Sequence, residues 1–181
     1  MILFVGCSKE NVSPTSLNNQ PTVDINSKSL TSSGLKVAEK ISGIVICTVD
    51  EDILSAAIVD YYGATQMKKM HVIEFNEGQV NNFYAICGRV RNGNQSTRFA
   101  FQLNPTTLGD STIELFLPVA GTEQNLVGPG NGACKLKLTS VSTGYASCQN
   151  SGQAVYTATT SAILVDDYGT SKLISHLLGM L

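Results

Sequence analysis

Residues 83–103 read FYAICGRVRNGNQSTRFAFQL, and this stretch decides the fold. Two alternating runs flank Asn92-Gly93, a dipeptide that strongly predicts a type I′ hairpin turn. With these two residues as the loop, the expected opposing pairs are Arg91 with Asn94, Ile86 with Phe99, and Tyr84 with Phe101. One side of the predicted hairpin is then wholly apolar, as the side that faces a protein core should be.

The other side of this hairpin carries Arg89, Arg91 and Arg98 beside small residues. Planar guanidinium groups bind carboxylates and sulfates through paired hydrogen bonds. The cluster is therefore the candidate site for an anionic ligand, such as an acidic sugar. Arginine is also common on solvent-facing strands that bind nothing, and this alternative stays open.

Similar period-two runs occur along most of the chain. The expected strands, including those of the hairpin, are residues 67–75, 82–91, 96–103, 112–119, 133–141, 144–149 and 154–165. Gly, Asn and Pro separate them at spacings typical of antiparallel sheets. Residues 43–49, GIVICTV, form a β-branched run that predicts a strand or the buried lead-in to a helix.

Two segments have a helical period instead. Residues 48–63, TVDEDILSAAIVDYYG, begin with the capping-box spacing of Thr48 and Glu51 and end at Gly63, which predicts a left-handed stop. Residues 170–181 place leucines and an isoleucine at helical spacing near the C-terminus.

These patterns predict one α+β domain that is predominantly antiparallel β. We expect a meander of about seven strands, arranged as a β-sandwich or an open barrel, with one helix on its N-terminal side and a short C-terminal helix.

Composition narrows the range of functions. The formal net charge of −2 predicts no electrostatic field that could gather nucleic acid, so no nucleic-acid partner is expected. No apolar run approaches the ~18 residues of a membrane-spanning helix. The chain has two histidines, and no cysteine spacing typical of a zinc site. We expect neither a metal nor another cofactor.

The N-terminal sequence LFVGC, residues 3–7, resembles a bacterial lipobox. The resemblance implies that residues 1–6 are the remnant of a signal peptide and that Cys7 is the acylated residue that holds the protein to a membrane. Lys9-Glu10 is similar to the charged export signals of surface lipoproteins from Bacteroidota. These features imply a cell-envelope protein, anchored to the outer membrane and facing the periplasm or the cell surface.

Residues 7–34 contain few large apolar side chains and many Ser, Asn, Thr and Pro. Such a segment buries too little surface to offset the entropy lost on ordering, so we expect a disordered tether. The domain is expected to span residues 35–181. We recognise no family in this part of the chain.

Four cysteines remain besides Cys7, which permits two disulfides in an exported chain. Proximity along the chain favours Cys134 with Cys148, which leaves Cys47 with Cys87. The alternative is four buried free thiols that pack as small apolar residues.

The leading interpretation is a non-enzymatic envelope lipoprotein that binds a small ligand, a glycan or a protein. A secreted or lipid-anchored hydrolase is the first alternative, and it would need two or more of a scattered set of residues to meet in one cleft. The members of this set are Asp60, His71, Asp110, Asp166 and Asp167. The second alternative is a structural subunit of a surface assembly, joined to its neighbours through exposed strand edges.

Overall fold

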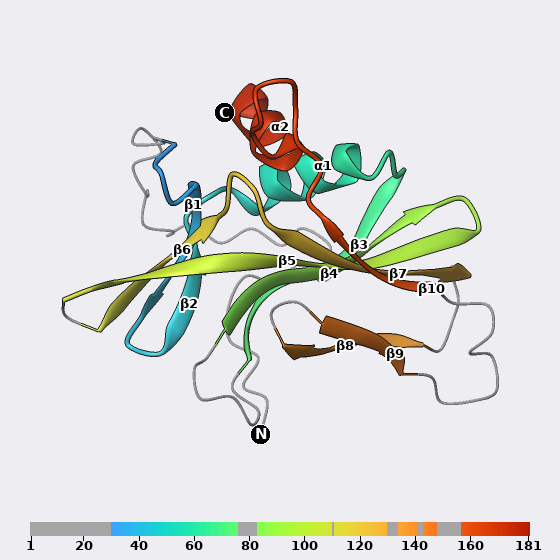
Figure 1. Cartoon of the computed structure of the whole chain (residues 1–181), viewed down its shortest axis with the longest axis horizontal. Coiled ribbons are helices and arrows are strands. Elements are labelled where there is room, and N and C mark those ends of the chain that lie inside the picture. Colours follow the sequence, from blue (N-terminus) through green and yellow to red (C-terminus); the bar gives the residue numbers. More distant parts are fainter. Residues whose placement is uncertain (1–29, 76–82, 110, 130–133, 141–142, 148–156) are drawn as a thin grey trace, which may run out of the picture.

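A computed structural model describes residues 30–75, 83–109, 111–129, 134–140, 143–147 and 157–181. It shows a mostly antiparallel β structure, a nearly closed barrel-like sheet that carries two helices (Figure 1). The expected fold class is confirmed, and of the two arrangements left open the sheet follows the barrel rather than the sandwich.

The elements follow one another as β1 Leu35–Ile41, β2 Ile44–Cys47, α1 Glu51–Tyr61, β3 Gln66–Phe75, β4 Phe83–Asn92, β5 Gln95–Leu108, β6 Thr112–Leu117, β7 Thr122–Pro129, β8 Lys135–Ser140, β9 Thr143–Ser147, β10 Thr157–Ala162 and α2 Lys172–Met180. All seven expected strands are present within this set. The run at 43–49 supplies β2, and β1 and β7 were not expected from the alternation pattern.

Strand β5 links the two parts of the main sheet. Its first half lies between β4 and β7, which gives the order β3-β4-β5-β7-β10. Its second half pairs with β6, which gives the order β5-β6-β1-β2. The meander therefore runs from β3 to β6, while β1, β7 and β10 join it out of sequence. Strands β8 and β9 form a separate hairpin.

The β4–β5 hairpin forms with a different register from the one expected. Asn92 pairs with Gln95, so the loop is Gly93-Asn94, and Tyr84 faces Leu103 rather than Phe101. Gly93 has φ +56°, and glycine at the first loop position is typical of a type II′ turn rather than type I′. The slip is two residues, so every side chain stays on the expected face.

Helix α1 has its N-cap two residues later than the capping box at Thr48 suggested. Asp50 is the N-cap, and its Oδ1 accepts hydrogen bonds from the backbone N–H groups of Asp52 (2.8 Å) and Ile53 (3.2 Å). Gly63, with φ +56°, follows the helix as the expected left-handed residue. Neither described helix is long and apolar enough to cross a membrane.

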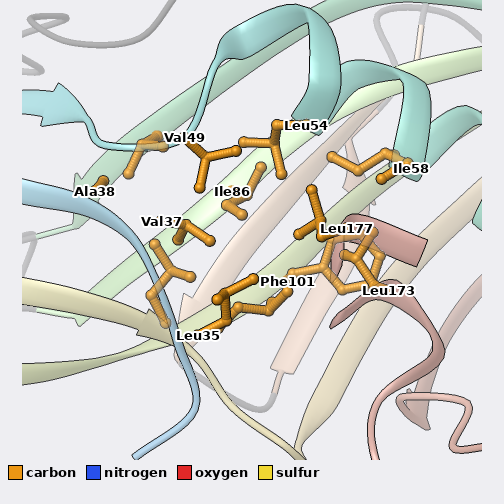
Figure 2. Packing of buried hydrophobic residues seen from close by; sticks show 14 of the residues in the cluster. Leu35, Val37, Ala38, Val49, Leu54, Ile58, Ile86, Phe101, Leu173 and Leu177 are labelled. Atoms are coloured by element: carbon orange, nitrogen blue, oxygen red, sulfur yellow. The ribbon is translucent and has the colours of Figure 1, made fainter. Parts of the chain in front are cut away.

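Both helices lie on the same side of the sheet, and the apolar face of the sheet turns toward them (Figure 1). Figure 2 shows Leu54 and Ile58 of α1 and Leu173 and Leu177 of α2 packed with Ile86, Phe101 and strand β1. These side chains are fully buried. Hairpin β8–β9 lies on the opposite side of the sheet (Figure 1). We call the helix-covered side the inner face and the other side the outer face.

Candidate functional site

The three arginines predicted to share a face do so, on the outer face of the β4–β5 hairpin. Arg89 lies directly opposite Arg98, and Arg91 lies two residues from Arg89 on the same side of β4. Lys69 of β3 lies opposite Arg89 on the other edge of β4. We call Lys69, Arg89, Arg91 and Arg98 the basic face. Sequence reasoning missed Lys69 because a bulge between Met67 and Lys69 shifts the β3 register.

The basic face concentrates one kind of charge. Its arginines are the only three in the chain. At the outer-face positions of β3, β4, β5 and β7, the described residues include no acidic side chain. Like charges directly across a sheet repel each other and destabilise the pairing. A row of cations such as this one also attracts anions.

The segment from residue 124 to residue 165 adds further positive charge on the outer side of the sheet. Residues 124–165 contain Lys135 and Lys137 and no Asp or Glu. This stretch includes hairpin β8–β9, which contacts β5, β7 and β10. Lys135, at the start of β8, is exposed. The charge of the protein is thus unevenly distributed, although its net value is only −2.

Hydrogen bonds anchor the end of the hairpin that carries Arg91. Its Nε donates to the carbonyl of Gly93 (2.9 Å), and its own carbonyl accepts from the backbone N–H of Thr65 (2.9 Å). The Asn92 amide donates to the carbonyl of Gly63 just after α1 (3.1 Å). A rigid scaffold limits the entropy lost when a ligand binds.

A second polar cluster lies on the inner face at the end of the barrel away from the helices. Lys40 Nζ lies 2.8 Å from both carboxylate oxygens of Glu74, and the Tyr84 hydroxyl donates to Glu74 Oε1 (3.0 Å). Burial, reinforced by Glu74, raises the pKa of Tyr84. The cluster pairs one cation with one carboxylate, so it holds no excess charge for an ionic ligand.

A third cluster joins α1 to β7. Glu123 and Asn125 are buried, and both lie within hydrogen-bond distance of the Tyr62 hydroxyl, at 3.0 and 2.8 Å. The Ser161 hydroxyl also donates to Glu123 (3.3 Å). Burial raises the pKa of Tyr62 well above its usual value, with Glu123 acting in the same direction. These bonds satisfy polar groups that would otherwise be costly to bury.

The described members of the proposed hydrolase set lie on opposite sides of the sheet. Asp60 of α1 contacts His176 of α2 through Oδ2 and Nδ1, and Asp166 accepts a hydrogen bond from Ser175 (2.6 Å). His71 lies on the outer face, opposite Cys87, because the inner positions of β3 are Met70, Val72 and Glu74. The alternation of β3 predicts that His71 shares the face of Ile73 and Phe75, and from these apolar neighbours an inward orientation is expected. The face is shared, but it is the outer one, so the expected inward orientation is wrong. Asp110 lies outside the described residues.

His176 differs from its expected environment as well. The helical pattern predicts a solvated side chain, whereas its side chain is 30 % exposed and contacts Asp60. Ser175 and His176 are consecutive on a helix and therefore point in different directions. The Ser175 hydroxyl is directed at Asp166, so these residues do not assemble a nucleophile with its base.

The bonding state of the cysteines contradicts one of the two predicted disulfides. Cys47 and Cys134 each take part in a disulfide, whereas Cys87 carries a free thiol. The Cys47–Cys87 pairing is therefore wrong. Burial raises the pKa of the Cys87 thiol to about 12, which keeps it in the unreactive neutral form. Cys148, the proposed partner of Cys134, and Cys7 lie outside the described residues.

Acidic residues near the start of α1 have a structural role. Asp50 caps the helix, and Glu51 and Asp52 lie in its first turn, where the helix dipole favours negative charge. Among the described residues no group of His, Cys, Asp and Glu could hold a metal ion.

Comparison with known proteins found no matching family model, no similar curated protein and no similar solved structure.

Proposed function

We propose that this protein is a lipid-anchored component of the cell envelope whose β domain binds an acidic glycan on the basic face. The observation that carries the proposal is the placement of all three arginines of the chain, with Lys69, on one stretch of sheet whose described outer-face residues include no acid. A non-enzymatic role follows from the use of this surface for binding alone.

The spacing of the cations favours a polymer with regularly repeated charges. Lys69, Arg89 and Arg98 lie on three adjacent strands, so their backbones are about 5 Å apart in a row. Consecutive sugar rings of a glycan are separated by a comparable distance. A chain of uronic acids or sulfated sugars can therefore present one anion to each strand. An arginine guanidinium group can bind such an anion through two hydrogen bonds, whereas the Lys69 ammonium group acts as a single charge. The Nε atom of Arg98 is itself buried.

The other polar clusters support this choice by contrast. Lys40 is matched by Glu74 on the inner face, and Glu123 is bonded by hydroxyl groups in the interior. Both clusters satisfy their own members. The basic face instead gathers four cations on three adjacent strands, an arrangement that attracts a polyanion.

The binding test uses immobilised polygalacturonate as the acidic glycan and dextran as the neutral one. We expect the protein to bind polygalacturonate alone, with an affinity that falls as salt is raised. Arg89→Gln should weaken binding by about tenfold, since charge-assisted hydrogen bonds contribute about 1.5–3 kcal/mol each. Lys172→Gln removes an exposed cation at the start of α2 and serves as the control with unchanged binding.

Equal binding to dextran and polygalacturonate would contradict a charge-based site. So would equal losses in Arg89→Gln and Lys172→Gln, because net charge alone would then explain the binding.

The anchor is tested through Cys7. With a full-length signal supplied, the protein should sediment with membranes, and Cys7→Ser should move it to the soluble fraction. A Cys7→Ser variant that still sediments with membranes would refute acylation at this residue, while leaving the glycan site open.

Disulfide mapping supplies an independent check on the anchor. Cys47 is disulfide-bonded and Cys87 is free, so within one chain the partner of Cys47 is Cys7, Cys134 or Cys148. Acylation uses the thiol of Cys7, and an acylated protein cannot contain a Cys7–Cys47 bond. Peptide mapping of the native protein under non-reducing conditions distinguishes these pairings.

A further inference from the structure

Strand β10 ends one row of the main sheet, and its sequence, TATTSA, is entirely exposed. It pairs with β7 along its whole length without a bulge. Among the described strands no other pairs with it. Its second edge therefore presents a row of backbone N–H and C=O groups that can pair with another strand.

Edge strands of natural sheets are usually protected against such pairing by charge, by proline, by bulges or by shortness. Strand β3, at the other end of the same row, carries Lys68, Lys69 and a bulge. Strand β2, at the end of the second row, has only four residues. Strand β10 contains no charge, no proline and no bulge, and residues 138–165 contain no charged residue at all. Strand β9 contacts β10 but does not pair with it among the described strands.

We propose that the β10 edge pairs with the β10 edge of a second copy of this chain, about a two-fold axis at Thr160. A two-fold axis perpendicular to the sheet leaves every side chain on its own face of the sheet. Because opposing residues of two paired strands share a face, the residue numbers of each opposing pair must add up to an even number. With Thr160 opposite itself, the other pairs are Thr159 with Ser161 and Ala158 with Ala162. Such an interface is self-complementary, as a two-fold dimer requires.

The side chains fit this register. Cross-strand Thr–Thr and Thr–Ser pairs stabilise antiparallel sheets, and small Ala–Ala pairs allow close approach. Strand β10 contains no charged residue, so no like charges oppose each other across the proposed interface. The dimer would join two main sheets into one continuous sheet, with the basic face of each copy at its outer ends.

The test exploits the residue on the axis. Thr160→Lys places two lysines opposite each other in the dimer, and Thr160→Glu places two glutamates there. Each variant alone should dimerise about two- to fivefold more weakly than the wild-type chain, because like charges directly opposed repel by up to about 1 kcal/mol. An equimolar mixture of the two should dimerise again, as lysine then opposes glutamate.

Sedimentation velocity of the full chain over a wide concentration range measures these states. Thr106→Lys, which adds the same charge at an exposed threonine of β5, is the control and should dimerise as the wild type does. The swap across the axis shows recovery only if the two copies meet at this residue, so misfolding cannot imitate the result.

A wild-type chain that stays monomeric over the range would overturn the proposal, whatever else the edge can bind. A wild-type dimer that Thr160→Lys leaves intact would also overturn it, since the dimer would then use another surface. Failure of the mixture to recover would overturn the two-fold at Thr160. None of these outcomes bears on glycan binding, which the Arg89→Gln experiment tests separately.

Discussion

The inner and outer faces of the β4–β5 hairpin come from the same residues of the chain and have opposite properties. On the inner face, Ile86, Phe99 and Phe101 are fully buried beneath the helices. On the outer face, Arg89 and Arg98 lie opposite each other. Because successive side chains of a strand alternate between faces, one hairpin sequence specifies both an apolar core face and a face that carries the arginines.

The comparison shows that the sequence of a strand specifies the face of each side chain more reliably than it specifies the pairing register. A slip of one residue would exchange the two faces and bury the arginines, at a prohibitive cost. A slip of two residues preserves both faces. The hairpin therefore keeps its predicted faces even though its predicted pairing is shifted by two.

The largest expected difference between the faces concerns stability. Phe101→Ala removes a fully buried ring that packs against Tyr61 and Phe99, and should lower the free energy of unfolding by about 3–5 kcal/mol. Arg91→Ala on the outer face should change it by less than about 1 kcal/mol. Urea titrations of the two variants measure the difference, and comparable losses would show that the outer face is also part of the core.

A smaller effect is expected at Gly88, where the backbone of β4 lies close to its neighbours. A Cβ at this position would collide with the ring of Phe99 and with the carbonyl oxygen of Lys69. Gly88→Ala should therefore destabilise the protein by about 1–3 kcal/mol. Gly109→Ala, at a glycine with open space around its Cβ position, is the control. If both variants kept wild-type stability, the close contact between β4 and Phe99 would be disproved.

Features encoded locally were predictable from the sequence, including the seven expected strands, both helices and the arginine cluster. Strand β7 was not, because its sequence TEQNLVGP is polar and ends in Gly-Pro. Glu123 and Asn125 are buried there only because Tyr62, distant in sequence, bonds to them. No local pattern can show that such polar residues have a buried partner.

Tertiary proximity explains the other differences. The pairing of Cys47 with Cys87 was inferred from sequence distance, yet Cys87 lies in the middle of β4 as a free, buried thiol. The contact between Asp60 and His176 joins two helices that lie far apart in sequence. The addition of Lys69 to the basic face depends on the β3–β4 pairing. Each of these depends on how the elements are packed.

An effect of intermediate size is expected for helix α1, which covers the inner face. Asp50→Ala removes the N-cap of α1 and leaves the N–H groups of Asp52 and Ile53 without that acceptor, so stability should fall by about 1 kcal/mol. Asp50→Asn retains a capping oxygen and should restore most of it. Equal losses in the two variants would show that the charge of Asp50, rather than its hydrogen bonds, stabilises the helix.

The smallest expected effect concerns pH and the segment that leads into α2. The Ser175 hydroxyl, assisted by the backbone N–H of Thr170, lowers the pKa of Asp166 below its usual value near 3.8. A carboxyl group with a lowered pKa stabilises the folded state above its unfolded pKa, and this contribution is lost as pH falls through the folded value. Ser175→Ala should therefore raise the pKa of Asp166, measured by NMR titration, and should weaken the protein at pH 7 more than at pH 2. Ser175→Thr keeps the hydroxyl and should keep the lowered pKa. An unchanged Asp166 titration in Ser175→Ala would mean that this hydrogen bond does not contribute to holding α2 over the inner face.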